Sequence, residues 1–124
     1  LSHSSAASDV YKRQILESSK NFVTISSSKE EALSDASIVT TDVWTSMNSA
    51  KQSKEKELIF KDFFVDSSAM NFSKEGSMFL HCLPAHRGEE VSFEMLDHPS
   101  SKVWMQAENR MHVQEAILEY LLLD

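Results

Sequence analysis

The feature that most constrains the fold is an alternation, from Asn21 onward, of short β-rich runs with helical stretches. This alternation is typical of βαβ units, in which crossover helices cover a mostly parallel sheet. The sequence therefore predicts an α/β fold with helices flanking that sheet. The runs expected to form strands are residues 22–25, 36–41, 63–66, 77–81 and 102–105.

Three helices are expected around these runs. Residues 29–33 form the first, where Ser28 is a suitable N-cap and Glu31, three residues on, completes a capping box. Residues 54–61 form a charged second helix, and apolar residues at helical spacing predict a third over 108–123. The side chains expected to face the core are Leu58 and Ile59 in the second helix and Met111, Val113, Ile117, Leu118, Tyr120 and Leu121 in the third.

Composition limits the classes of function. A chain of 124 residues that is 41% hydrophobic can bury one modest core. Because 19 acidic residues outnumber 12 basic ones, no basic surface is expected for nucleic acid or an anionic membrane. The single cysteine and the short apolar runs favour a cytoplasmic protein with neither disulfides nor membrane spans. We therefore expect small molecules or proteins as partners.

Scarce residues gather at the expected carboxyl ends of two strands. Asp42 follows the second predicted strand, and Cys82 follows the fourth. In a parallel sheet these positions lie at the ligand-binding edge, so we expect the two side chains to face one another if their strands are neighbours. A carboxylate suits an ammonium group, and a thiol beside a cation can lose its proton near neutral pH. Arg110 is expected on the inward side of the last helix, where it would bind an anion.

Each of these residues also has a purely structural interpretation. Cys82 can be a small buried hydrophobe, and Asp42 can cap a helix that begins at Val43. His81, Cys82 and His86 together suggest metal ligands, but Pro84 interrupts any helix that would align them and no fourth ligand is near in sequence. We therefore predict that the chain has no metal site.

Three motifs together resemble those of the ornithine carbamoyltransferases. HCLPAHRGEEV at 81–91 resembles the His-Cys-Leu-Pro signature, and DVWTSM at 42–47 resembles the Asp-x-x-x-Ser-Met ornithine loop. QAENR at 106–110 is similar to a third motif near the family's C-terminus. The resemblance covers about residues 15–123. It implies a partial, Rossmann-like second domain at residues 15–124, preceded by an unrelated, disordered leader at residues 1–14.

The resemblance also implies a reaction. Family members transfer the carbamoyl group of carbamoyl phosphate to the δ-amine of L-ornithine, giving L-citrulline and phosphate without a metal or organic cofactor. By similarity, Asp42, Ser46 and Met47 would hold the α-ammonium and carboxylate of ornithine. Cys82 and Leu83 would lie beside the δ-amine and the carbamoyl group. Arg110 would contact carbamoyl phosphate.

The chain departs from the family in ways that limit these expectations. Asn48 stands where the family usually has glycine, and neither a Ser-x-Arg-Thr-Arg phosphate loop nor a His-Pro-x-Gln segment occurs. The resemblance therefore implies an ornithine-binding domain that lacks its first strand and its N-terminal carbamoyl phosphate domain. The parent enzyme would be a homotrimer, and the isolated chain would be inactive. Two alternatives remain: a non-catalytic amino-acid-binding half-domain, and a sister carbamoyltransferase acting on putrescine or acylated ornithine.

Overall fold

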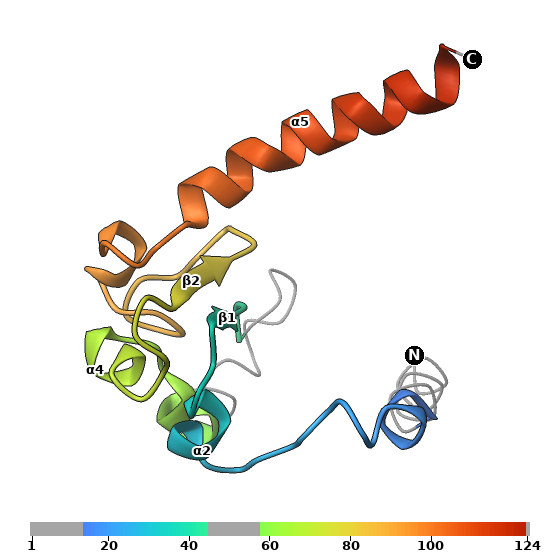
Figure 1. Ribbon diagram of the computed structural model, residues 1–124. Helices are drawn as coiled ribbons and strands as arrows, with labels where there is room; N and C mark the ends of the chain where they lie inside the picture. Colours follow the sequence, from blue (N-terminus) through green and yellow to red (C-terminus); the bar gives the residue numbers. More distant parts are fainter. Residues whose placement is uncertain (1–13, 45–57, 124) are drawn as a thin grey trace, which may run out of the picture.

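A small parallel sheet at the centre of the chain carries the fold (Figure 1). The structure, a computed structural model, describes residues 14–44 and 58–123. Along the chain the elements are α2 (Lys29–Leu33), β1 (Ile38–Thr41), the 3₁₀ turn η2 (Lys61–Phe63), α4 (Ser67–Met70), β2 (Met78–His81), the 3₁₀ turn η3 (Met95–Asp97) and α5 (Val103–Leu122). The α/β class predicted from the sequence is confirmed.

Strands β1 and β2 are parallel neighbours in register. Ile38 lies opposite Met78, and the pairing continues in step until Thr41 lies opposite His81. They are the cores of the second and fourth predicted strands, so the expectation that those two runs are adjacent is confirmed. The far edge of β2 carries one further bridge, from Phe79 to Ser101. Both strands therefore end at the same rim, immediately before Asp42 and Cys82.

The other three predicted strands are wrong. Residues 22–25 form no strand, and Phe22 is 91% exposed. In the run 63–66 only Val65 pairs, through a single bridge to Val91. The run 102–105 instead begins helix α5. β-Branched and aromatic residues favour strands only where a neighbouring strand and a buried face are available, and these runs lack one or both.

The core lies between the strands and the segments that follow them. Asp66 caps α4 by accepting a hydrogen bond from the Ala69 N–H at 2.7 Å, which holds Ala69 and Met70 against the sheet. η3 contributes Met95 and Leu96. The buried apolar cluster consists of Val39, Val65, Ala69, Met70, Phe79, Val91, Met95, Leu96 and Val103.

Helix α2 begins with the N-cap that the sequence predicts, but the Glu31 carboxylate has a different hydrogen-bond partner. The Ser28 hydroxyl accepts a hydrogen bond from the Glu31 N–H at 3.2 Å, so the predicted N-cap is confirmed. The Glu31 carboxylate, however, accepts from the Ser26 hydroxyl at 2.6 Å. The Ser28 N–H donates to the Ser26 Oγ at 3.0 Å. The Ser26 hydroxyl therefore stands between the Ser28 N–H and the Glu31 carboxylate, in place of the direct hydrogen bond that a capping box has there.

Helix α5 begins earlier than predicted and extends away from the body of the molecule (Figure 1). Val103 is its one buried residue. The apolar side chains that the helical period assigned to the core are exposed, as is Arg110, which was expected to face inward. Leu58 and Ile59, also expected inside, are 77% and 66% exposed. Among the described residues, no helix is both long enough and apolar enough to cross a membrane.

Candidate active site

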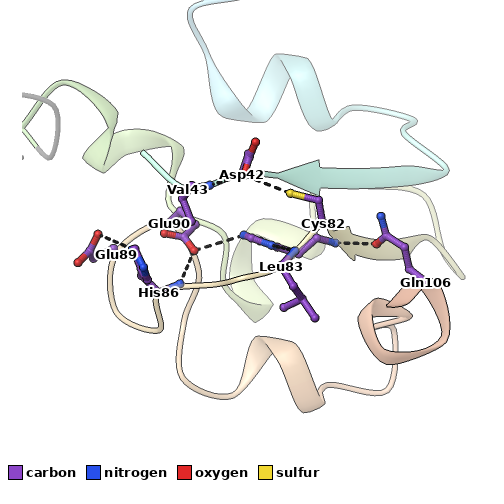
Figure 2. A network of polar contacts seen from close by, with 9 residues as sticks. Asp42, Val43, Cys82, Leu83, His86, Glu89, Glu90 and Gln106 are labelled. Atoms are coloured by element: carbon purple, nitrogen blue, oxygen red, sulfur yellow. Dashed lines mark hydrogen bonds and ion pairs between the residues drawn. The ribbon is translucent and has the colours of Figure 1, made fainter. Parts of the chain in front are cut away.

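The two residues that follow β1 and β2 are in direct contact. The Cys82 thiol donates a hydrogen bond to Asp42 Oδ1 across 3.2 Å (Figure 2). The parallel register ends both strands at the same level, so their first loop residues meet at the carboxyl edge of the sheet. The structure thus brings together two residues that lie 40 positions apart in the sequence.

Each of these two groups alters the protonation of the other. The Cys82 hydrogen bond lowers the pKa of Asp42, and a hydrogen bond from the Val43 N–H at 2.8 Å lowers it further. In return, the Asp42 carboxylate raises the pKa of the Cys82 thiol, while Arg110 opposes that rise. Arg110 thus acts on the pKa of Cys82 in the direction that the sequence analysis describes for a cation, but Asp42 and burial raise that pKa by more. The nearby carboxylate outweighs the more distant guanidinium, so Cys82 is a thiol that donates to a carboxylate.

Arg110 lies on α5, one turn after Gln106, and its side chain is exposed. It lines a groove of about 510 Å³ between β2 and α5, together with Leu80 and Gln106. Gln106, one turn before Arg110, accepts a hydrogen bond from the His81 N–H at 3.0 Å and so ties α5 to the end of β2 (Figure 2). Arg110 is therefore held near the rim while its guanidinium is open to solvent and free to meet an anion.

The loop after Cys82 has an unusual backbone. Leu83 adopts a left-handed conformation, with φ of 56°, and the Leu83–Pro84 peptide bond is cis. A non-glycine residue in the left-handed region costs about 1–3 kcal/mol and persists where its surroundings hold it. Here the Leu83 N–H donates to His81 Nδ1 at 2.9 Å. This hydrogen bond fixes the Leu83 backbone directly beside Cys82.

A buried pair behind the rim was missed by the sequence analysis. His81 Nε2 lies 3.3 Å from Glu90 Oε1, and neither side chain is exposed. The same Glu90 oxygen accepts a hydrogen bond from the His86 N–H at 2.6 Å (Figure 2). In the sequence, Glu90 follows Gly88 and Glu89 and is indistinguishable from a solvated acidic residue. Glu90, Val91 and Ser92 are buried in succession, a pattern that neither a helical nor a strand period predicts.

A small pocket adjoins Asp42. Its volume is about 390 Å³, and it is lined by residues 41–44 with Phe60 and Phe63. The rings of Trp44 and Phe60 stack there with centroids 6.3 Å apart. Ser46 and Met47, the other two residues expected to bind ornithine, lie outside the described residues.

The metal set considered from the sequence does not form. His81 and Cys82 are engaged separately, with Glu90 and with Asp42. Within the described ranges, the only group of three or more metal-ligating side chains that meets is His86, Glu89 and Glu90. His86 is common to both sets.

Comparison with known proteins is consistent across sequence and structure. Residues 3–121 match the sequence model of the family described as aspartate/ornithine carbamoyltransferase, Asp/Orn binding domain. An ornithine carbamoyltransferase of Nitrosomonas europaea is 53% identical over 96 residues, which are 77% of this chain and 31% of that protein.

Solved structures give the same match. The ornithine carbamoyltransferase from Burkholderia thailandensis superposes with a TM-score of 0.72 at 42% identity, covering 86% of this chain and 32% of that one. The enzyme from Pyrococcus furiosus gives a TM-score of 0.68 at 46% identity, covering 73% of this chain and 29% of that one. The chain therefore spans about a third of the length of the relatives that it matches.

Proposed function

This chain belongs to the aspartate/ornithine carbamoyltransferase family, and we propose that it supplies the ornithine-binding part of an ornithine carbamoyltransferase. In that reaction the δ-amine of L-ornithine attacks the carbonyl carbon of carbamoyl phosphate. A carbon–nitrogen bond forms, the bond from that carbon to the phosphate oxygen breaks, and the amine loses a proton. The products are L-citrulline and phosphate. The observation that carries the proposal is the contact between Cys82 and Asp42 at the shared rim of β1 and β2.

The chemistry of this pair suits an amino-acid substrate. The lowered pKa of Asp42 keeps it a carboxylate, and a carboxylate beside an open pocket attracts an ammonium group. We assign the α-ammonium and carboxylate of ornithine to Asp42, Ser46 and Met47. Cys82 then lies beside the δ-amine. Because that amine has a lysine-like pKa, it must shed a proton before it attacks, and the adjacent thiol and carboxylate can bind the ammonium form and relay the proton.

Carbamoyl phosphate, the electrophile, would bind on the other side of the rim. The carbonyl oxygen gains negative charge in the tetrahedral intermediate, and phosphate leaves as an anion, so positive charge and fixed donors stabilise both. Arg110 is exposed, and its charge acts on Cys82. Leu83 contributes the constrained backbone at the start of the loop. We assign contacts with carbamoyl phosphate to Cys82, Leu83 and Arg110.

We further propose that the 124-residue chain does not catalyse the reaction by itself. It contains no Ser-x-Arg-Thr-Arg loop and no His-Pro-x-Gln segment, the motifs that serve carbamoyl phosphate in the family. Citrulline should not form when the purified chain is given both substrates at high concentration. Turnover above that of a Cys82→Ala control would refute this part of the proposal.

A chimera tests the assignment of the reaction. Residues 15–123 would replace the matching segment of the Nitrosomonas europaea ornithine carbamoyltransferase, and citrulline formation would be measured. We expect activity in the chimera and a loss of kcat/KM of about 100-fold or more with Asp42→Asn in the grafted segment, because proton transfer and substrate charge would both be affected. Lys74→Gln, a change at an exposed position, is the matched control.

The preferred substrate distinguishes an ornithine carbamoyltransferase from a sister carbamoyltransferase that acts on putrescine or acylated ornithine. The same chimera would be assayed with putrescine and with N-acetylornithine in place of L-ornithine. We expect L-ornithine to be the preferred substrate, because Asp42 and Ser46 would bind its α-ammonium and carboxylate. Putrescine has neither group, and the α-amine of N-acetylornithine is masked. A higher kcat/KM for either competitor would overturn the ornithine assignment. An inactive but folded chimera would favour the non-catalytic binding domain.

A further inference from the structure

Three metal-ligating side chains meet in the loop that follows the His-Cys-Leu-Pro segment. One ligand atom from each of His86, Glu89 and Glu90 lies within 4.8 Å of the other two. Figure 2 shows the imidazole of His86 between the two carboxylates, all three converging on one side of the loop. This group is separate from the Asp42–Cys82 contact and has no role in the proposed carbamoyl transfer.

Two atoms of this group are buried and have no hydrogen-bond partner. Glu90 Oε1 is occupied by His81 and by the His86 N–H, but Glu90 Oε2 has none. His86 Nδ1 is likewise shielded from solvent without a well-aligned hydrogen bond. Buried polar atoms are almost always paired, and a buried carboxylate oxygen without a partner carries a desolvation cost. Because Glu90 is wholly buried, its free oxygen points to a ligand.

The backbone holds the three side chains in place. The Glu89 N–H donates to the His86 carbonyl at 3.0 Å, closing a turn that brings the two side chains together. The Gly88 N–H donates to the Val91 carbonyl at 2.7 Å, and Gly88 has a φ of 93°, which favours glycine. A Cβ at Gly88 would also come within 3.1 Å of the Phe93 ring. The turn is therefore a defined structure.

We propose that His86 Nδ1, a Glu89 oxygen and Glu90 Oε2 form a site for a first-row divalent metal ion, with Zn²⁺ as the best fit. One imidazole and two carboxylates match zinc, whereas Mg²⁺ and Ca²⁺ prefer oxygen ligands alone. Zinc–ligand bonds of about 2.0–2.2 Å put neighbouring tetrahedral ligands about 3.4 Å apart. His86 Nδ1 and Glu89 Oε2 are already 3.3 Å apart.

Two of the three side chains are partly exposed, so a metal ion could reach the site from solvent. The side chains of His86 and Glu89 are 40% and 44% exposed, whereas Glu90 forms the buried floor. The open side leaves a fourth position for water. Two carboxylates and a neutral imidazole balance the charge of the dication. Glu90 Oε1 keeps its contacts with His81 and the His86 N–H, so bound metal would also pin the loop.

The competing explanation is a surface ion pair between a protonated His86 and Glu89. Zinc titration of the full 124-residue chain distinguishes the two, in a Cys82→Ser background that removes the one thiol as a rival ligand. We expect saturable binding of one Zn²⁺ per chain by calorimetry. Co²⁺ should give a visible d–d spectrum of tetrahedral type, which a simple ion pair cannot produce.

Single substitutions locate the site. His86→Ala and Glu89→Gln should each raise the Kd for Zn²⁺ by about tenfold or more, since even outer-shell partners of a metal contribute 10–100-fold. The matched controls are His112→Ala and Glu94→Gln, which alter an exposed histidine and an exposed glutamate elsewhere. Circular dichroism checks that each variant is folded. Absence of saturable binding, or equal Kd values in the site and control variants, would overturn the proposal.

Discussion

The rim of the sheet and the C-terminal part of α5 contain similar apolar residues, which are buried at the rim and exposed along α5. Phe79 on β2 and Val103 at the start of α5 are fully buried. Ile117 and Leu121, further along the same helix, are 51% and 66% exposed. The first region packs because β2 lies between β1 and the segment around Ser101, with α4 and η3 completing the core. The second has no described element against it.

This difference separates helix formation from helix packing. The apolar spacing along α5 predicts a helix, and the helix forms over 20 residues. In proteins most helical stability comes from burying an apolar face rather than from helix propensity. Val103 and the Gln106 hydrogen bond anchor the start of α5 to β2. We therefore expect stability to be concentrated at the rim and to decrease along α5.

The largest effect should come from the core of the rim. Phe79→Ala should reduce the free energy of unfolding by about 3–5 kcal/mol, because it leaves a cavity between β1 and η3. Ile117→Ala is the matched change on α5 and should alter it by no more than about 0.5 kcal/mol. Urea unfolding followed by circular dichroism measures both. Similar losses from the two substitutions would show that α5 is packed in solution and would break the comparison.

A smaller effect is expected from the buried carboxylate behind the rim. Glu90→Gln should destabilise the fold by about 1–3 kcal/mol, because the amide oxygen can keep the contacts of Oε1 but the N–H₂ group then takes the place of Oε2, which is buried without a hydrogen-bond partner. Glu94→Gln, at an exposed position four residues later, should have almost no effect. Equal midpoints for the two variants in the same urea experiment would contradict the assignment of Glu90 to the interior.

The cap of α4 should contribute about 1 kcal/mol, which Asp66→Ala removes. Burial raises the pKa of Asp66, but the hydrogen bonds from the Ala69 N–H and the Ser68 hydroxyl outweigh it, so the folded pKa lies below its ordinary value. A lowered folded pKa means that this stabilisation is present above the unfolded pKa of about 4 and is lost as the pH falls further. The difference between wild type and Asp66→Ala should therefore shrink below about pH 4. Asp62→Ala, an exposed neighbour, should show no such dependence.

The last prediction concerns the reactivity of the Cys82 thiol. It is the most specific to the rim, and we expect its substitutions to affect stability least. Asp42→Asn removes the carboxylate that raises the pKa of Cys82, so the pH midpoint for alkylation by iodoacetamide should move to lower pH. Arg110→Gln removes an opposing charge and should move the midpoint to higher pH. Lys74→Gln should leave it unchanged. Shifts of the same sign in the first two variants would show that the three groups do not share one rim.

Much of the site was predictable because it is encoded locally or by simple topology. The Ser28 cap, the two strands that pair and the adjacency of Asp42 and Cys82 all follow from short patterns and from the rule that parallel strands end at one edge. The three wrong strands were short β-rich runs that resemble strands in isolation. Whether such a run pairs depends on which neighbours reach it, which no local pattern records.

By itself, the sequence determined the capped start of α2, the two strands that carry the site and which polar residues follow them, since each depends on spacing within a few residues. Only the tertiary structure decided that Glu90 is buried against His81, that Cys82 is held as a thiol by Asp42 and that the apolar face of α5 remains open. These outcomes depend on contacts between distant segments. Burial and pKa are properties of such contacts, so the same residue types gave opposite results at the rim and along α5.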